Sequence, residues 1–419
     1  MNAEPLSSEV RRLIGGNTLS AIGTGFTLPF LLIYLTDARG LGVGTAANAI
    51  AVLGIAGLLT VPLMGWLSDR VGPWRVLVGA LLVEGVATAL FAGVTRPWHA
   101  FATLALLGIG QAATWPSQSA LIAQLVPAER RARVYAVQFA LLNLGIGVGG
   151  AVSGLVVDEA RVGTFQAIYL VDALSFAVYA VVLLTLRHAA LRPPPRPPEG
   201  GPSGYGDLLR DRAFLRVCLV TLLMSTAGYG QIYAGFPGFA TDVAGVSTRV
   251  LGLAFAANTF VIVAAQMSVQ RRLQGHRRSR ALMGVGLVWA ASWAVIGSAA
   301  LTAGTLSAAA VVAGLMLFGL GETLWAPTGA TLVNDMAPPH LRGRYNAVSS
   351  VTWQLSAVIG PVVAGALLEA GLGAELIGGL VAILLLVALL ARRLERHLSP
   401  EANNARPLDP LPEEVLPIP

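Results

Sequence analysis

The sequence predicts an all-α membrane protein with 12 transmembrane helices in two parallel six-helix repeats. Of its 419 residues, 55% are apolar and only 12% are charged, whereas a soluble domain carries about 25% charged residues. Apolar runs of about 20 residues, the length of one helical span of a bilayer, recur about twelve times. A repeated set of motifs divides these spans into two groups of six.

The spans are expected where the apolar runs lie. In chain order they cover residues 12–36, 43–66, 76–95, 98–125, 134–157, 164–187, 214–240, 247–270, 280–300, 305–334, 345–369 and 373–392. The chain then consists of a cytoplasmic N-terminus (1–11), an N-terminal six-helix bundle (12–187), a cytoplasmic linker (188–213), a C-terminal six-helix bundle (214–392) and a tail (393–419). Proline cannot continue a helix in the linker, and the proline-rich tail is expected to be disordered.

The arginines predict the orientation of the spans. The chain has 28 arginines and no lysine, and the arginines gather in the termini and in connections that share one side of the membrane. The exceptions are Arg39, Arg96, Arg161 and Arg249. Because cytoplasmic loops carry the excess of basic residues, we expect both termini in the cytoplasm. The all-arginine, alanine- and glycine-rich composition favours a GC-rich genome and a bacterial inner (cytoplasmic) membrane.

The composition excludes most soluble chemistry. Without lysine there is neither a phosphate-binding GxxxxGK[ST] loop nor a lysine-held pyridoxal cofactor. The single cysteine, Cys218, excludes an internal disulfide, and the five histidines show no metal-binding spacing. We therefore expect no enzyme activity, no cofactor, no metal and no nucleic-acid partner. The expected partners are a small-molecule substrate, protons and the lipid bilayer, and the chain is expected to be a monomer.

The repeat covers two connections and the spans that flank them. Gly110, Pro116, Pro127, Arg131 and Arg133 recur at a constant offset of 211 residues as Gly321, Pro327, Pro338, Arg342 and Arg344. Repeats of six spans share one orientation and are therefore parallel. This arrangement is typical of transporters whose substrate site lies between the halves near the bilayer midplane.

A second motif carries a resemblance to a known family. Between the second and third spans, Gly65, Asp69, Arg70, Gly72 and Arg75 match the signature G-x-L-a-D-r-x-G-r-k, and over residues 10–395 the chain resembles the major facilitator superfamily. The resemblance implies that Asp69 lies against the N-terminus of a neighbouring helix and holds the cytoplasmic side closed, with Arg70, Arg75 and Arg133 as expected partners. A solvated loop acid is the alternative. Gly72 is expected to allow a tight turn.

Two further motifs resemble the multidrug/proton antiporter branch of this family. Residues 145–150 are similar to G-P-x-x-G-G, with Ile146 in place of the proline, and residues 321–327 are similar to G-E-x-x-x-x-P. The arginine that these antiporters usually carry in the fourth span is Leu104 here. This chain therefore lacks one common proton-coupling residue. The glycines of residues 145–154 are expected to allow close helix packing.

Three carboxylates lie inside predicted spans: Glu84, Asp172 and Glu322. An ionised carboxylate in hydrocarbon is costly, so each must face protein or water or take up a proton, as proton coupling requires. In the superfamily the tenth span lines the cavity and the third and sixth are scaffold, which makes Glu322 the main proton-coupling candidate, followed by Asp172 and Glu84. The alternative for each is a structural buried acid, and it is the favoured one for Asp172 and Glu84.

Polar and aromatic residues on the cavity-lining spans are the substrate-binding candidates. They are Asn17, Tyr34, Gln111, Trp115, Gln118, Asn143, Tyr229, Tyr233, Asn258, Glu322, Trp325, Trp353 and Gln354. Aromatic faces attract organic cations, and no arginine lies in the middle of a span to attract an anion. For any one of these residues the alternative is a helix–helix hydrogen bond or a place in the interfacial aromatic belt.

These observations favour a secondary transporter that exports hydrophobic or cationic small molecules in exchange for protons by alternating access. The alternative is a carrier of the same family for one solute such as a sugar, an amino acid or a metabolite, including an importer. A non-transporting membrane scaffold or sensor is disfavoured by the short loops.

Overall fold

A computed structural model of the chain describes residues 6–158, 160–187, 204–232 and 234–404. The predictions for residues 1–5, for the linker segment 188–203, for Tyr233 and for the tail segment 405–419 fall outside these residues. Every regular element within the described ranges is helical, in agreement with the all-α class expected from composition.

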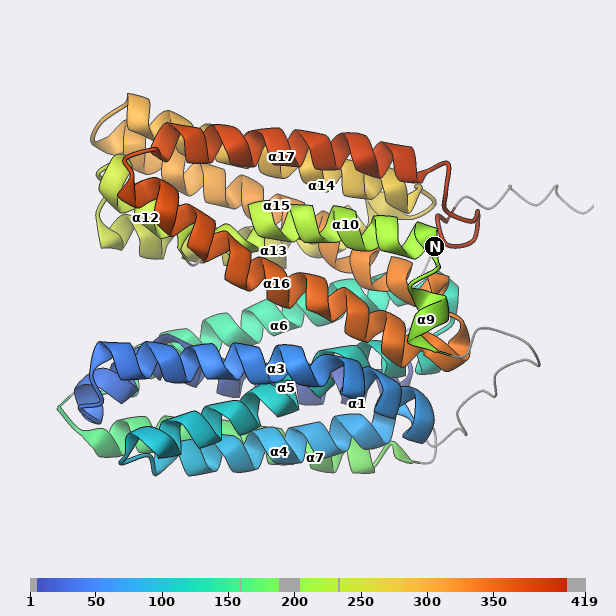
Figure 1. Cartoon of the computed structure of the whole chain (residues 1–419), viewed down its shortest axis with the longest axis horizontal. Coiled ribbons are helices and arrows are strands. Elements are labelled where there is room, and N and C mark those ends of the chain that lie inside the picture. Colours follow the sequence, from blue (N-terminus) through green and yellow to red (C-terminus); the bar gives the residue numbers. More distant parts are fainter. Residues whose placement is uncertain (1–5, 159, 188–203, 233, 405–419) are drawn as a thin grey trace, which may run out of the picture.

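Figure 1 shows two bundles of long helices side by side, each built from one half of the chain. The N-terminal bundle contains α1 (Ser8–Thr27), α3 (Val43–Val71), α4 (Pro73–Ala92), α5 (Pro97–Leu125), α6 (Ala128–Val156) and α7 (Val162–Leu184). The C-terminal bundle contains α10 (Arg212–Ala227), α13 (Thr248–Leu273), α14 (Arg278–Ser298), α15 (Thr305–Met336), α16 (Arg342–Glu369) and α17 (Gly373–Leu394). Short pieces extend or connect these helices: η1 (Leu28–Phe30), α2 (Leu31–Ile33), η2 (Tyr34–Ala38), α9 (Tyr205–Leu208), α11 (Tyr229–Ile232), α12 (Gly235–Gly238), η3 (Phe239–Val243), η4 (Ala299–Leu301) and η5 (Pro339–Leu341).

Eleven helical segments of the described chain are long and apolar enough to cross a membrane. They correspond to eleven of the predicted spans, with ends that differ by a few residues. The remaining prediction, 98–125, coincides with α5, whose 29 residues would extend about 43 Å. This helix is not among the eleven, and its second half carries the polar residues Gln111, Thr114, Ser117, Gln118 and Ser119. The count of twelve spans therefore stays a prediction.

The seventh predicted span, 214–240, is not one continuous helix. α10 ends at Ala227, and Gly228 leaves the helical conformation with φ −101° and ψ −96°. The ring of Trp289 lies so close to Gly228 that a side chain there would overlap it. The indole of Trp293 donates to the Ala227 carbonyl (2.8 Å) and so satisfies a carbonyl at the end of the helix. The break therefore follows from two tryptophans of α14, which the local sequence of α10 does not reveal.

Glycines let the long helices of each bundle approach closely. On α6, a side chain at Gly145 or Gly149 would overlap the backbone of α1, and Gly25 of α1 lies directly against Gly149. In the C-terminal bundle Gly360 of α16 lies against Gly230 of α11 in the same way. By contrast, a side chain at Gly154 would meet nothing within 4 Å. Close packing, which the sequence predicted for this glycine-rich stretch, is present at Gly145 and Gly149 but not at Gly154.

The two bundles contact each other through α3 and α5 against α16, and through α6 against α13 and α15. The turns α3–α4, α5–α6, α13–α14 and α15–α16 lie at one end of the molecule together with the start of α1, to the right in Figure 1. We call this the arginine-rich end. α16 runs obliquely, so that its first turns reach the N-terminal bundle there.

The contact of Gly149 with α1 predicts a selective loss of stability on enlargement. Gly149→Ala forces a methyl group against the carbonyl of Ile22, and overpacking of this kind costs about 1–3 kcal/mol. We expect a lower midpoint of thermal unfolding in detergent for Gly149→Ala. The matched control Gly154→Ala, on the same helix, should unfold at or above the wild-type temperature, and equal midpoints for the two variants would contradict the packing assignment.

Candidate functional site

The Asp69 carboxylate, near the end of α3, binds the first turn of α16 in the other bundle. Its oxygens accept hydrogen bonds from the amides of Gly343 (2.6 Å) and Arg344 (3.2 Å), and the Arg344 guanidinium lies 3.7 Å away. Amides in the first turn of a helix have no partner within the helix, and the positive end of the helix dipole favours a carboxylate there. Asp69 of α3 thus joins the two bundles by accepting hydrogen bonds from the free amides at the N-terminus of α16.

Glycines make this contact geometrically possible. A side chain at Gly343 would overlap both the Gly65 carbonyl and the Asp69 carboxylate, and one at Gly65 would overlap Ala347. Gly72 ends α3 with φ +95°, a conformation that favours glycine. The signature glycines therefore set the approach of α3 to α16 and the turn into α4.

The cation beside Asp69 is Arg344, which the sequence analysis had quoted only as part of the repeat. Of the expected partners, Arg70 stacks on Trp66 at 5.1 Å, and Arg75 of α4 donates to the Val71 carbonyl at the end of α3 (2.8 Å). The third, Arg133, lies on α6. The structure thus brings Asp69 to a helix N-terminus, but with a cation from the C-terminal bundle.

α9 adds a contact to the same place from the end of the linker. The Tyr205 hydroxyl donates to the Pro62 carbonyl of α3, and the Arg344 guanidinium lies over its ring at 5.6 Å. Partial burial raises the pKa of Tyr205 to about 12, so the hydroxyl keeps its proton at neutral pH. α9 thereby ties the C-terminal half of the chain to α3.

A second ionic contact between the bundles centres on Asp335, near the end of α15. Arg131 of α6 pairs with one carboxylate oxygen, and Arg278 of α14 pairs with the other at 2.7 Å. All three side chains are about nine-tenths buried. Arg131 also donates to the carbonyls of Ala123 (2.8 Å) and Val126 (3.1 Å), which fixes its direction. Removing one member of such a buried pair costs about 3–5 kcal/mol.

The neighbouring Asn334 completes a polar network across the interface. Its amide donates to the Ser119 hydroxyl (2.9 Å) and to the Tyr135 hydroxyl (3.1 Å) of the N-terminal bundle. Sequence reasoning missed Asn334 and Asp335, although two adjacent polar residues at the end of an apolar run were an available signal. Together with Asp69, these contacts close the interface between the bundles at the arginine-rich end.

A buried carboxylate lies deeper in the C-terminal bundle. Glu322 of α15 is 6% exposed, accepts a hydrogen bond from the Asn258 amide of α13 (2.9 Å) and is also hydrogen-bonded by Tyr229 of α11. The Tyr229 ring packs against Trp353 of α16 at 4.4 Å and against Trp289 at 5.2 Å between ring centroids. Four of the predicted substrate-binding residues therefore form one cluster: Tyr229, Asn258, Glu322 and Trp353.

Within the cluster, Trp353 is nearly half exposed. The predicted residues Trp325 and Gln354 of the same bundle have other neighbours. Trp325 is half-buried and lies over Gly329, one turn away on α15. The Gln354 amide oxygen lies about 3.2 Å from where a side chain on Gly57 of α3 would begin, so it faces the other bundle.

In the N-terminal bundle the predicted residues fall into separate groups. Asn17 of α1 bonds Gln118 of α5 and Gln138 of α6, both at 3.5 Å, while Asn143 donates to a carbonyl of its own helix (2.9 Å). Gln111 is exposed, and Trp115 is nearly half exposed.

Tyr34 is a different case. It is fully buried, donates to the Ala92 carbonyl and packs among aromatic rings inside its own bundle. The structure therefore does not bring Tyr34 to the cluster around Glu322.

The other two intramembrane carboxylates lie inside the N-terminal bundle. Glu84 of α4 accepts a hydrogen bond from Thr114 of α5, and Asp172 of α7 accepts from Thr27 of α1 (2.8 Å). Each is 3% exposed. In the described part of the chain, the hydrogen-bond donors to both carboxylates are hydroxyl groups of their own bundle.

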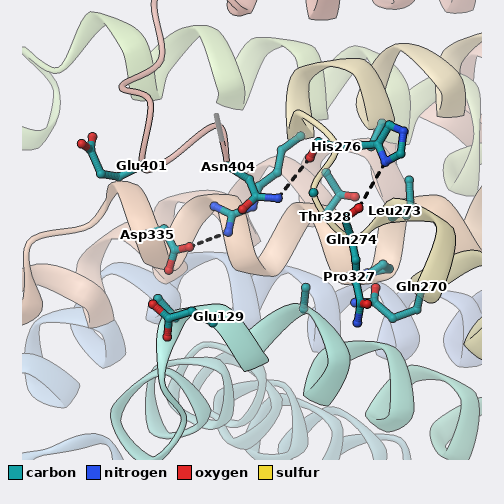
Figure 2. A pocket seen from close by; sticks show the side chains of 15 residues that line it. Glu129, Gln270, Leu273, Gln274, His276, Pro327, Thr328, Asp335, Glu401 and Asn404 are labelled. Carbon is teal, nitrogen blue, oxygen red and sulfur yellow. Dashed lines mark hydrogen bonds and ion pairs between the residues drawn. The ribbon is translucent and has the colours of Figure 1, made fainter. Parts of the chain in front are cut away.

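A cavity of about 290 Å³ opens at the arginine-rich end, between α6, α13, α15 and the tail. Figure 2 shows Asp335 and Glu129 on one side of it and Gln270, Gln274 and Asn404 around its rim. Arg278 also lines this cavity, which thus lies directly beside the ionic contact between the bundles.

Comparison with known proteins decides the family. The profile of the Major Facilitator Superfamily matches residues 13–312 and 277–417. The chain belongs to the major facilitator superfamily. It is 26% identical over 359 residues to the multidrug resistance protein MdtH of Aeromonas hydrophila, with 83% of this chain and 85% of that protein covered. It is 24% identical over 371 residues to a Na⁺, Li⁺, K⁺/H⁺ antiporter of Planococcus maritimus, covering 80% and 83%.

The fold also matches solved structures. A bacterial homologue of the iron transporter ferroportin superposes with a TM-score of 0.74 at 15% identity, covering 93% of this chain and all of that one. The superfamily consists of transporters, so this chain is a multi-pass membrane transporter rather than an enzyme. The resemblance stated from the signature motif is thereby confirmed.

The Asp69 contact predicts that its removal loosens the closed end. In a Cys218→Ser background, Ala347→Cys places a thiol at a fully buried site between α3 and α16. Adding Asp69→Asn should raise the rate at which a soluble maleimide alkylates this thiol, because the charge that attracts the α16 N-terminus is gone. Arg75→Gln is the control, since the described hydrogen bond of Arg75 is to Val71 in the same bundle, and equal rates in both variants would refute a closing role for Asp69.

Proposed function

We propose that this transporter exports hydrophobic or cationic small molecules in exchange for protons. The observation that carries the proposal is the Glu322 cluster: a buried carboxylate bonded by Asn258 and Tyr229, with the half-exposed ring of Trp353 against Tyr229. An ionised carboxylate at a buried site in the membrane is costly unless a cation pairs with it. The proton can therefore leave Glu322 at low cost only when a cationic substrate takes its place. Aromatic faces beside it favour organic cations, by about 0.5–2 kcal/mol for each ring.

The electrostatic setting of Glu322 supports a cationic or neutral substrate. Among the described contacts, its partners are an amide and a hydroxyl, and no arginine pairs with it. An anionic substrate would therefore meet an acid without a fixed countercharge. Two relatives with 24% and 26% identity are named as a cation/H⁺ antiporter and a multidrug resistance protein. Their names support a cationic or hydrophobic substrate.

We further propose that twelve spans form two parallel six-helix repeats that rock about this site. The repeated motifs at an offset of 211 residues support this symmetry. Gly149 and Gly360 are also 211 residues apart, and each lies against a glycine of a neighbouring helix. With the arginine-rich end in the cytoplasm, the contacts of Asp69, Asn334 and Asp335 would hold the cytoplasmic side closed in this mechanism. The inner membrane of a bacterium is the proposed location.

In this mechanism Glu322 takes up a proton from outside, and opening of the arginine-rich end exposes it to the cytoplasm, where substrate replaces the proton. Asp172 and Glu84 serve as structural acids held by Thr27 and Thr114. Reversal of the rocking carries the substrate out. Each step requires only that proton and substrate compete for one carboxylate.

The test is proton-gradient-driven movement of a fluorescent lipophilic cation in reconstituted vesicles. Wild type should accumulate the dye when the gradient is imposed, and Glu322→Gln should fall to the level of vesicles without protein, because an amide cannot exchange a proton. The matched controls Asp172→Asn and Glu84→Gln should retain movement. Retention in Glu322→Gln together with loss in Asp172→Asn would move the coupling site, and a wild type inactive with every such dye would favour a carrier for one specific solute.

A further inference from the structure

We propose that residues 399–404 are a strap that stabilises the closed arginine-rich end by positioning Arg278. The inference concerns regulation of the gate and rests on the rocking of the two bundles in the proposed function. It starts from the described part of the tail, which follows α17 and packs against the α13–α14 turn instead of leaving the molecule.

The strap caps α14 from a distant part of the sequence. The Arg278 amide donates to the Asn403 carbonyl (3.1 Å) and the Ser279 amide donates to the Asn403 side-chain oxygen (2.9 Å). The residue at the helix start, Arg277, provides no side-chain cap, so Asn403 satisfies amides that the helix cannot. Asn403 is 2% exposed and Ala402 3%. Ala402 and Asn403 are therefore buried to the same extent as core residues, whereas residues 399–401 are exposed.

Glu395 fixes the chain just before the strap. Its carboxylate pairs with Arg277 and, at 3.3 Å, with Arg280, and Leu398 packs into the core of the C-terminal bundle. At the far end, the Asn404 amide donates to the His276 carbonyl (3.2 Å). The strap is therefore held on both sides of Asn403.

One guanidinium connects the strap to the gate. Arg278 donates to the Ala402 carbonyl at 2.6 Å and to the Asp335 carboxylate at 2.7 Å. The second oxygen of Asp335 pairs with Arg131 of the other bundle. The strap thus orients Arg278, and Arg278 in turn orients the Asp335 carboxylate. The other oxygen of this carboxylate is then free to pair with Arg131.

The charges explain why the strap favours closure. Two guanidinium groups meet the Asp335 carboxylate only while Arg131 is in place. Positive charge is therefore more concentrated around Asp335 in the closed state than in the open state. The Ala402 carbonyl accepts from Arg278, and the strap's Glu401 lines the same cavity as Arg278 and Asp335. Figure 2 shows Glu401 and Asn404 above this cavity and Glu129 of α6 across it. The Ala402 carbonyl and Glu401 of the strap offset the positive charge that gathers around Asp335 in the closed state. Because this interaction differs between the closed and open states, it can shift the equilibrium towards closure.

The experiment measures hydrogen exchange in the first turn of α16. The Gly343 and Arg344 amides bond to Asp69 across the interface, so their exchange reports opening of the gate and needs no substrate. The chain truncated after Leu398 should exchange these amides about tenfold faster than wild type, the change expected from one hydrogen bond to a charged group. Truncation after Asn404 is the matched control and should leave the rate unchanged.

Two further variants separate gating from general destabilisation. Asn403→Ala in the full chain should also raise the exchange rate of the Gly343 and Arg344 amides. Exchange in α4 and α7 of the other bundle should stay unchanged. In an Asp335→Asn background, truncation after Leu398 should add less than about twofold, because the strap acts through this carboxylate.

Three results would overturn the proposal. They are unchanged or slower exchange after truncation at Leu398, an equal effect of truncation at Asn404, and a full tenfold effect in the Asp335→Asn background. Failure of the dye transport test with a normal strap effect would instead count against the proposed substrate and leave the gate intact.

Discussion

The structure depends on one carboxylate at one helix N-terminus. Asp69 of α3 accepts two hydrogen bonds from amides in the first turn of α16, and Gly65 and Gly343 let the backbones of the two bundles approach closely there. The attraction is between a charge and a backbone dipole, so it needs no particular side chain on α16 beyond the absence of one at Gly343. Such a contact is strong when the helix end is in register and is lost after a small displacement. This is the property required of a gate that must open in every cycle.

The second contact between the bundles and the buried carboxylate lie on the same helix. α15 carries Glu322 in its middle and Asn334 and Asp335 near its end, where they bind the other bundle. Pro327 lies between them and leaves the Thr323 carbonyl without its helical donor, and the Gln266 amide of α13 supplies the missing hydrogen bond (3.1 Å). Glu322 and Asp335 therefore share one helix, and a hydrogen bond from α13 satisfies its free carbonyl at Thr323.

Much of this arrangement could be predicted from the sequence. Apolar runs located the long helices, and the signature motif placed Asp69 at a helix N-terminus. The sequence did not reveal the break at Gly228, because its causes, Trp289 and Trp293, lie about sixty residues away. It did not identify Arg344 as the cation beside Asp69. The packing of the two bundles decides which arginine of the connections lies near this carboxylate, and the sequence does not show that packing. It also grouped Tyr34 with the cavity residues, although its hydrogen bond and aromatic neighbours lie inside one bundle.

The most direct test of this account measures both ends of the molecule at once. Spin labels at Thr95 and Thr302 report the separation of the bundles at one end, and labels at Arg75 and Arg271 report it at the arginine-rich end, all at exposed positions. Rocking of the bundles predicts two distance populations for each pair in lipid. Asp69→Asn should shift the arginine-rich pair to longer distances and the other pair to shorter ones. A single population for the arginine-rich pair, or a change of both pairs in the same sense, would contradict closure by Asp69 and the rocking of the bundles.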